Sequence, residues 1–318
     1  MTLDPADDGS PRALSKKTSG QIEAKGRFVM GTTQRSAPTV AVAVDGSGQG
    51  LGALRFAIDE ARARGTGVRM VHVLDRDDTG QIMDPYMTEA CVAAPDVEFD
   101  WRFGRGPLAD ELVAAAGAGD LLVLGQTTPW SPERPGVSAV ITEVAAHTAA
   151  ALVVVPADWR ARHHHRIVVG VKSCANAGGL LARAFAEASA RGAALEIVHA
   201  CDTADRAAVA RVDARRGDRH RSEGRTLDAL VRDWSDVFPG VAVETSFTHG
   251  QPARVLIDAA TDADLLMIAR HQRHLARLGP TPRAVLGASD IPVEVVPLTG
   301  APTPAPLVLT RSGTILKN

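Results

Sequence analysis

Short apolar runs alternate with longer segments of helical periodicity along most of this chain. The runs span five or six residues and are rich in Val, Leu and Ile, as in residues 40–44, 121–125 and 151–155. Runs that are apolar throughout are typical of strands buried on both faces of a sheet. Helical segments between such strands indicate parallel strands joined by right-handed crossovers. The pattern therefore predicts an α/β fold.

The same order of segments occurs twice. Thr39–Asp45 is echoed by Arg166–Lys172, and in both copies an Ala- and Arg-rich stretch then leads to a run containing Val-His, at an offset of 127 residues. Further on, Gly106–Gly125 matches Gly250–Ala269 at an offset of 144. The second copy therefore carries an insertion between its second and third strands. A repeat of this length indicates two copies of one folding unit.

Each copy has the order β-α-β-α-β-α-β-α-β, which provides too few strands to close a barrel. We therefore expect two tandem, open, five-stranded parallel sheets with helices on both faces. The expected segments are a disordered N-terminal arm (1–37), a first unit (38–157), a basic linker (158–165), a second unit (166–298) and a Pro-rich C-terminal tail (299–318).

Composition and charge narrow the classes of function. The net charge of −2 provides no basic field, so neither nucleic acid nor a membrane is expected as a partner. Three scattered cysteines, interpreted as free thiols, the lack of a leader-like N-terminus and the lack of a long apolar run predict a cytoplasmic protein. The motifs of P-loop, Rossmann, hydrolase and zinc-protease sites are also missing, so we expect no enzyme.

Several short motifs of the two repeated units together resemble those of the universal stress protein family. They include Val42–Ser47, Ala57–Gly65, Gly119–Gly125 and the closing Val153–Pro156, and the resemblance covers residues 39–156 and 166–297. It implies the strand order 3-2-1-4-5. It also implies pairing of units through their last strands, which in this chain gives an intramolecular pseudo-dimer.

The resemblance further implies a site for ATP. Members that bind ATP have an Asp at the end of strand one and a glycine-rich loop after strand four. Bare backbone N–H groups in such a loop can surround phosphates, and the Asp can accept hydrogen bonds from ribose or from the adenine amine. In this sequence the matching or neighbouring residues are in the first unit: Asp45, Gly46, Gly125, Gly136 and Ser138.

The first-unit site departs from the family pattern in its phosphate loop. Thr128 stands at the second glycine, and prolines at 129, 132 and 135 remove three N–H donors. Two structural interpretations stay open beside nucleotide binding. Asp45 can form a turn that caps the next helix, and Ser138 can N-cap the helix that follows it, which is the interpretation we favour.

The second unit departs further. Lys172–Ser173 replaces Asp-Gly, Ala269 replaces the first glycine, and Arg270–Arg277 replaces the small-residue loop. Its basic side chains could bind an anion, but we favour a solvated loop. For His163–His165 we likewise favour a solvated linker over a metal site. The paired Val-His motifs of the two copies suggest a role in packing rather than in catalysis.

The leading hypothesis is a non-enzymatic stress-response or signalling module that has at most one degenerate ATP site, in the first unit. The alternative is an interaction protein that recruits an unidentified protein partner independently of nucleotide, with both sites decayed. Slow ATP hydrolysis is a third hypothesis, for which the sequence assigns no residues.

Overall fold

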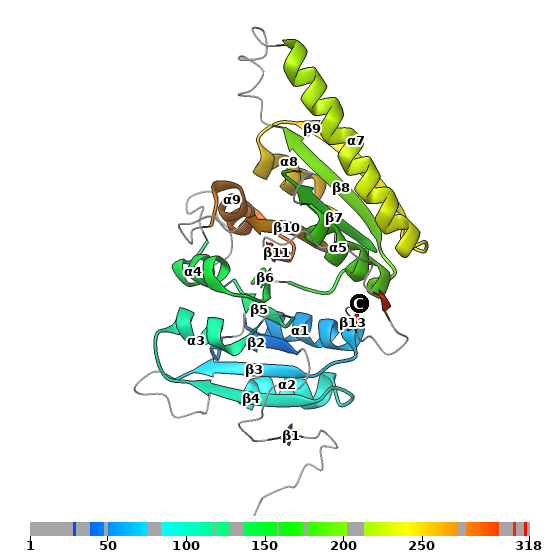
Figure 1. Ribbon diagram of the computed structural model, residues 1–318. Coiled ribbons are helices and arrows are strands. Elements are labelled where there is room, and N and C mark those ends of the chain that lie inside the picture. The colour runs from blue at the N-terminus through cyan, green and yellow to red at the C-terminus, as the bar shows by residue number, and fades with distance from the viewer. Residues whose placement is uncertain are drawn as a thin grey trace, which may run out of the picture.

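The computed structural model describes most of both repeated units. The described residues are 28–29, 39–47, 50–74, 84–117, 119–126, 137–157, 159–173, 177–201, 213–271, 278–298, 308–309 and 315–316. Figure 1 shows the first unit in the lower half of the view and the second unit above it, with strands and helices alternating in both.

The first unit contains five strands and four helices among its described residues. Its strands are β2 (Val40–Ala43), β3 (Val68–Val73), β4 (Phe99–Gly104), β5 (Leu121–Gly125) and β6 (Ala151–Val155). Its helices are α1 (Gly50–Arg64), α2 (Asp84–Ala93), α3 (Leu108–Ala115) and α4 (Ala139–His147).

The second unit repeats this order. Its strands are β7 (Arg166–Val171), β8 (Ala194–Cys201), β9 (Val243–His249), β10 (Leu265–His271) and β11 (Val293–Leu298). Its helices are α5 (Gly178–Arg191), α7 (Asp213–Val237), α8 (Pro252–Ala259) and α9 (Pro280–Ala288). The 25-residue α7 lies between the second and third strands of the unit, in the connection that the predicted insertion lengthens, where the first unit has the 10-residue α2.

The strand order confirms the expected fold, and the pairing of the two units through their last strands is the pseudo-dimer that the resemblance implied. The first unit runs β4-β3-β2-β5-β6 and the second β9-β8-β7-β10-β11, which is 3-2-1-4-5 in both, with parallel pairing. The two five-stranded sheets are also joined to each other through their last strands. Strands β6 and β11 pair antiparallel, so the units share one continuous sheet of eleven strands, which includes β1 (Phe28–Val29) at the outer edge of β4. The outer edge of the last strand of each unit is thus hydrogen-bonded to the last strand of the other unit.

Two apolar cores lie on opposite faces of this sheet, and each is continuous across both units. One packs α1, α2, α5 and α7 against the sheet, and the other packs α3, α4, α8 and α9. Strand alternation produces this division, because Val40 and Val42 belong to the first core and Ala41 to the second. Both faces of the central strands are therefore buried, as their uniformly apolar sequences predicted, whereas the edge strand β9 is half-buried or exposed along its length.

An Asp before the fourth strand of each unit fixes the start of the first strand. Asp120 accepts hydrogen bonds from the backbone N–H groups of Thr39 (2.9 Å) and Gly117 (2.8 Å). In the second unit Asp264 accepts from the N–H of His164 at 2.9 Å. Each Asp satisfies backbone donors that the strand ladder leaves unpaired. The repeated Asp-Leu-Leu motif is therefore structural.

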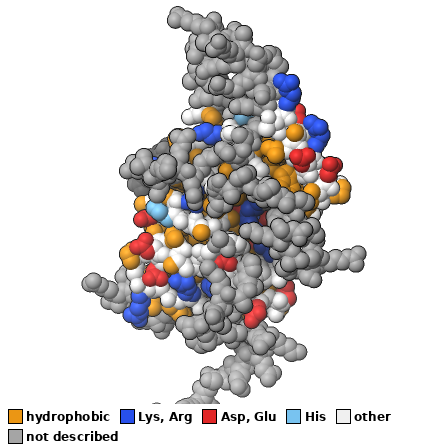
Figure 2. Space-filling view, viewed as in Figure 1, with side chains coloured by type: hydrophobic (Ala, Val, Ile, Leu, Met, Phe, Trp, Pro, Cys, Tyr) orange, Lys and Arg blue, Asp and Glu red, His pale blue; other side chains and the backbone are white. Residues whose placement is uncertain are grey.

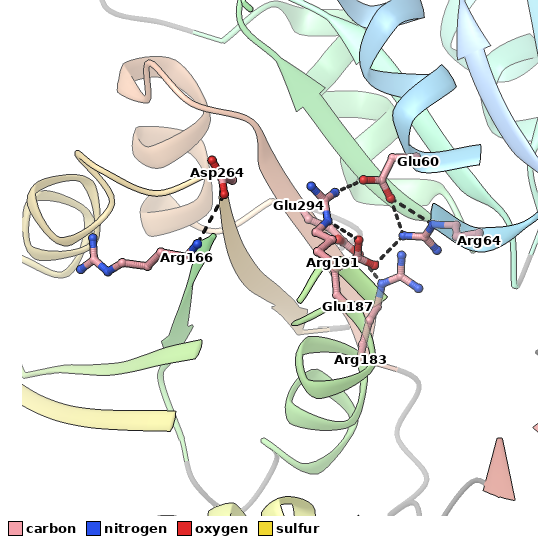
Figure 3. A network of polar contacts seen from close by, with 8 residues as sticks. All are labelled: Glu60, Arg64, Arg166, Arg183, Glu187, Arg191, Asp264 and Glu294. Carbon is pink, nitrogen blue, oxygen red and sulfur yellow. Dashed lines mark hydrogen bonds and ion pairs between the residues drawn. The ribbon is translucent and has the colours of Figure 1, made fainter. Parts of the chain in front are cut away.

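Partly buried ion pairs, in which the glutamates are buried, join α1 to α5 beside the β6–β11 junction, as Figure 3 shows. Arg64 contacts Glu60 of its own helix at 2.8 Å and Glu187 of α5 at 2.7 Å. Arg191 contacts Glu187 at 2.7 Å and also pairs with Glu60. Burial raises the pKa of Glu187 and lowers that of Arg191. The four charges form a closed ring between the units.

The junction is not symmetric in every residue. On the sheet, Glu294 of β11 lies directly opposite Val153 of β6. The carboxylate of Glu294 is 1% exposed and pairs with Arg183 of α5. The first unit has Phe56 at the position that corresponds to Arg183, and Phe56 packs edge-on against Trp159 with 5.4 Å between ring centroids. An ion pair in one unit thus corresponds to apolar packing in the other.

The two terminal segments lie largely outside the described residues. Phe28–Val29, within the arm expected to be disordered, pairs with Phe99–Asp100 of β4. In the tail, β12 (Val308–Leu309) and β13 (Ile315–Leu316) pair with each other and not with the main sheet. Within the described residues, no helix is long and apolar enough to cross a membrane.

Candidate functional site

The expected site lies at the carboxyl ends of two adjacent strands, β2 and β5. The two strands run parallel, with Val42 beside Val123. Asp45–Ser47 follows β2, and Gly125–Gln126 ends β5, so both segments lie at the same edge of the sheet. In open α/β sheets this edge, where the strand order reverses, is the usual position of a ligand.

Asp45 forms a tight turn with Ser47 before α1 begins. Its Oδ1 accepts hydrogen bonds from the backbone N–H of Ser47 at 2.9 Å and from the Ser47 hydroxyl at 2.7 Å. The Ser47 Oγ in turn accepts from the N–H of Gly50 at 3.2 Å. This is the Asx-turn that was the structural interpretation of the motif. Asp45 remains exposed to solvent, so the turn does not occupy the whole carboxylate.

Gly46 occupies a left-handed conformation within this turn. Its φ is +82°, which residues with a Cβ adopt only with strain. The backbone at Gly46 is exposed. The Asp45-Gly46 sequence is therefore required by the turn itself, whether or not a ligand binds there.

A buried tyrosine that the sequence did not point to supports the turn. Tyr86 of α2 is 0% exposed, and its hydroxyl donates to the Ser47 carbonyl at 2.8 Å and lies 3.4 Å from Asp45 Oδ1. Burial, followed by the negative charge of Asp45, raises the pKa of Tyr86 to about 12. Its distance in sequence and its position in an apolar helix gave no signal of this contact.

His72 ties the next strand to the end of β2. Its Nδ1 donates to the Val44 carbonyl at 2.7 Å, and the imidazole is 4% exposed. The second unit repeats this contact, with His199 Nδ1 donating to the Val171 carbonyl at 2.9 Å. The repeated contact supports the interpretation of both histidines as packing residues. One of them nevertheless positions the residue just before Asp45.

The loop expected to bind phosphates is described only at its two ends. Gly125 is half-buried at the end of β5, and the Gln126 N–H donates to the Val155 carbonyl at 2.8 Å. At the far end Ser138 N-caps α4, because its Oγ accepts from the Ile141 N–H at 3.1 Å. That capping role was the favoured interpretation. Gly136 and the three prolines lie outside the described residues.

The second unit has different side chains at the matching positions. Lys172 replaces Asp45, and Ala177 replaces Gly50. Arg270, which could have belonged to an anion site, is 6% exposed and donates instead to the carbonyls of Ala146 and Thr148 at the carboxyl end of α4. Its guanidinium is therefore buried against α4 of the first unit and joins the two units. The rest of that basic loop, 272–277, lies outside the described residues.

The linker histidines lie beside a separate cleft. The rings of His163 and His165 stack with 6.3 Å between centroids, and the cleft of about 700 Å³ also borders α1 and the second unit. Its walls carry both signs of charge, including Asp59, Asp290 and Arg191. Across the part of the chain that the structure describes, no cluster of three or more His, Cys, Asp or Glu side chains is arranged to hold a metal ion.

Comparison with known proteins identifies the family. The sequence model of the universal stress protein family matches residues 37–90 and 163–297, more than half of the chain. A universal stress protein of Mycobacterium tuberculosis is 24% identical over 278 residues, covering 81% of this chain and 96% of the relative. A second, from Mycolicibacterium smegmatis, is 24% identical over 286 residues, with the same coverage. This chain belongs to the universal stress protein family. The second matched region spans the second repeated unit, and the first covers the opening part of the first unit.

A solved structure supports the same fold. The universal stress protein from Archaeoglobus fulgidus superposes with a TM-score of 0.58 at 15% identity, covering 81% of this chain and 98% of that chain. This similarity extends over both units and so includes their arrangement in tandem.

Proposed function

We propose that this protein is a non-enzymatic stress-response module that binds one adenine nucleotide, at the carboxyl edge of its first unit. The observation that carries the proposal is the geometry of Asp45. Its Oδ1 takes part in the turn, and for Oδ2 the described residues provide no hydrogen-bond donor. An exposed carboxylate oxygen at a strand end can accept from a ribose hydroxyl or from the adenine amine.

A difference in side chains between the two units supports a single nucleotide site per chain. Lys172 takes the place of Asp45 in the second unit and can only donate hydrogen bonds. Arg270, at the end of β10, contacts α4 instead of the sheet edge. The second unit thus lacks the acceptor on which the proposal depends. We expect one nucleotide per chain.

Calorimetric titration with ATP and AMP tests the proposal. Wild type should bind either nucleotide with a stoichiometry near one, and Asp45→Ala should abolish the binding heat. Lys172→Ala is the matched control at the same position of the second unit, and it should bind as wild type does. An absence of heat with wild type, or equal binding by Asp45→Ala, would contradict the proposal.

An ATP hydrolysis assay tests the non-enzymatic part of the proposal. Wild type should release phosphate from ATP no faster than buffer alone does, and faster release would contradict this part.

A nucleotide-independent interaction protein is the second candidate. It is favoured by the conversion of the second unit's site residues to structural use, which Arg270 exemplifies. Figure 2 shows acidic and basic side chains interspersed over the coloured part of the visible face, a surface that suits a protein partner better than a polyanion. Stoichiometric capture of one partner by wild type and by Asp45→Ala alike, with or without ATP, would support this candidate.

A further inference from the structure

We infer that Tyr86 and Gly50 act together as a positioning device for the Asp45 carboxylate, an inference that rests on the proposed function. The phenol of Tyr86 fixes the orientation of the turn, and Gly50 provides the space in which the phenol hydroxyl stands. Nucleotide affinity in the first unit therefore depends on two residues that contribute no ligand contact of their own.

Two donors of Ser47 converge on one oxygen of the Asp45 carboxylate, and the Tyr86 hydroxyl lies close to the same oxygen. Asp45 Oδ1 faces the Ser47 N–H at 2.9 Å, the Ser47 hydroxyl at 2.7 Å and the Tyr86 hydroxyl at 3.4 Å. A carboxylate with one oxygen held by fixed donors has little freedom to rotate. Its other oxygen then points in a defined direction before any ligand arrives, which reduces the entropy cost of binding.

The phenol of Tyr86 is itself held rigidly. Tyr86 is fully buried, and its single O–H proton is donated to the Ser47 carbonyl at 2.8 Å. The hydroxyl therefore contacts the turn at both Asp45 and Ser47. Because α2 packs on α1 through the apolar core, the turn is anchored to the body of the unit and not only to itself.

Gly50 leaves room for the phenol because it has no side chain. A Cβ built there would lie 2.1 Å from the Tyr86 hydroxyl oxygen, much closer than two such atoms can approach. The corresponding residue of the second unit is Ala177, and the residue corresponding to Asp45 there is Lys172. The space for a hydroxyl and the carboxylate that it orients are thus both features of the first unit.

Two substitutions perturb this contact from opposite sides. Tyr86→Phe removes the hydroxyl and keeps the aromatic ring in the core. Gly50→Ala keeps the hydroxyl but displaces it from the turn. Gly178→Ala is the matched control, because Gly178 is the first residue of α5 as Gly50 is of α1, and a Cβ there meets nothing within 4 Å. Ala in place of Gly favours a helix at both positions.

The first measurement needs no ligand. Tyr86 is the only tyrosine of the chain, so tyrosinate absorbance during an alkaline titration reports this one hydroxyl. Its midpoint should lie at about 12 in wild type. It should fall only part of the way toward the ordinary tyrosine value of about 10 in Asp45→Asn and in Gly50→Ala, because burial, the larger cause of the raised pKa, remains. It should stay unchanged in Gly178→Ala. An unchanged midpoint in Asp45→Asn would overturn the inference.

The second measurement is ATP affinity by calorimetry. Tyr86→Phe and Gly50→Ala should each weaken binding about tenfold, the equivalent of one lost hydrogen bond, while Gly178→Ala binds as wild type does. Unchanged affinity in Tyr86→Phe would overturn the inference while leaving the nucleotide site in place. If wild type itself binds no ATP, the proposed function fails, and the alkaline titration alone decides whether Tyr86 and Gly50 position Asp45.

Discussion

Arg64 of the first unit and Glu187 of the second form a partly buried ion pair, with 2.7 Å between Nη2 and Oε2. The repeat gives this contact a counterpart, because Arg191 and Glu60 occupy the equivalent positions and also pair across the units. The Glu60 and Glu187 side chains are only 2% and 6% exposed. Removing one charge from this ring would therefore leave the others without full compensation in a site shielded from water.

Glu187→Gln should be strongly destabilising. The substitution leaves Arg64 and Arg191 facing a neutral amide, and we expect the free energy of unfolding to fall by about 3 kcal/mol. Urea denaturation measures this change. Asp258→Asn is the control, because it breaks an exposed pair with Arg254 on α8, and it should change stability by less than about 1 kcal/mol. Equal effects of the two substitutions would contradict a structural role for the ring.

Arg270→Met should loosen α4. The substitution keeps a long side chain but removes the donors for the carbonyls of Ala146 and Thr148, so these acceptors lose their partners at the helix end. We expect a cost of about 2 kcal/mol and faster hydrogen exchange in the last turn of α4. Arg254→Met, at an exposed position of α8, provides the comparison. Unaltered exchange in α4 would show that Arg270 contributes nothing to that helix.

Alkaline pH should weaken the first unit through Tyr86. Its folded pKa of about 12 lies above the ordinary value of 10.0, so the folded protein holds the phenolic proton more tightly than the unfolded chain does. This contribution to stability is complete below about pH 10 and is lost as the pH rises toward 12, by about 2–3 kcal/mol. The stability difference between wild type and Tyr86→Phe, measured by denaturation at successive pH values, should shrink over this interval. A constant difference would contradict the raised pKa.

The fold followed from the sequence because its signals are local and repeated. Apolar strands such as 151–155, the alternation with helices and the internal repeat fix the layers and the number of strands, and the strand order follows from the family resemblance. The hydrophobic pattern alone does not predict that the two sheets join. Their joining depends on an antiparallel register between β6 and β11, which arises from packing between segments more than 130 residues apart.

The candidate site could be predicted from the sequence only in part. Asp45, Gly46 and the Ser138 cap are short-range motifs, and each lies within three residues of its partner. The contact of Tyr86 with this turn spans 39 to 41 residues, and the Arg270 contact with α4 spans more than 120. The local sequence around Arg270 and around Tyr86 does not indicate which distant residues these side chains contact. Tertiary packing alone decides their roles.

The opposition of Glu294 and Val153 limits how the units can assemble. These residues occupy equivalent positions of the two copies and face each other across the β6–β11 junction. A homodimer of second units made through the same strands would place two buried Glu294 carboxylates opposite one another, which is an unfavourable cross-strand pair. The second half therefore pairs better with the first, a partner that presents Val153 at this position, and linkage in one chain guarantees a ratio of one to one.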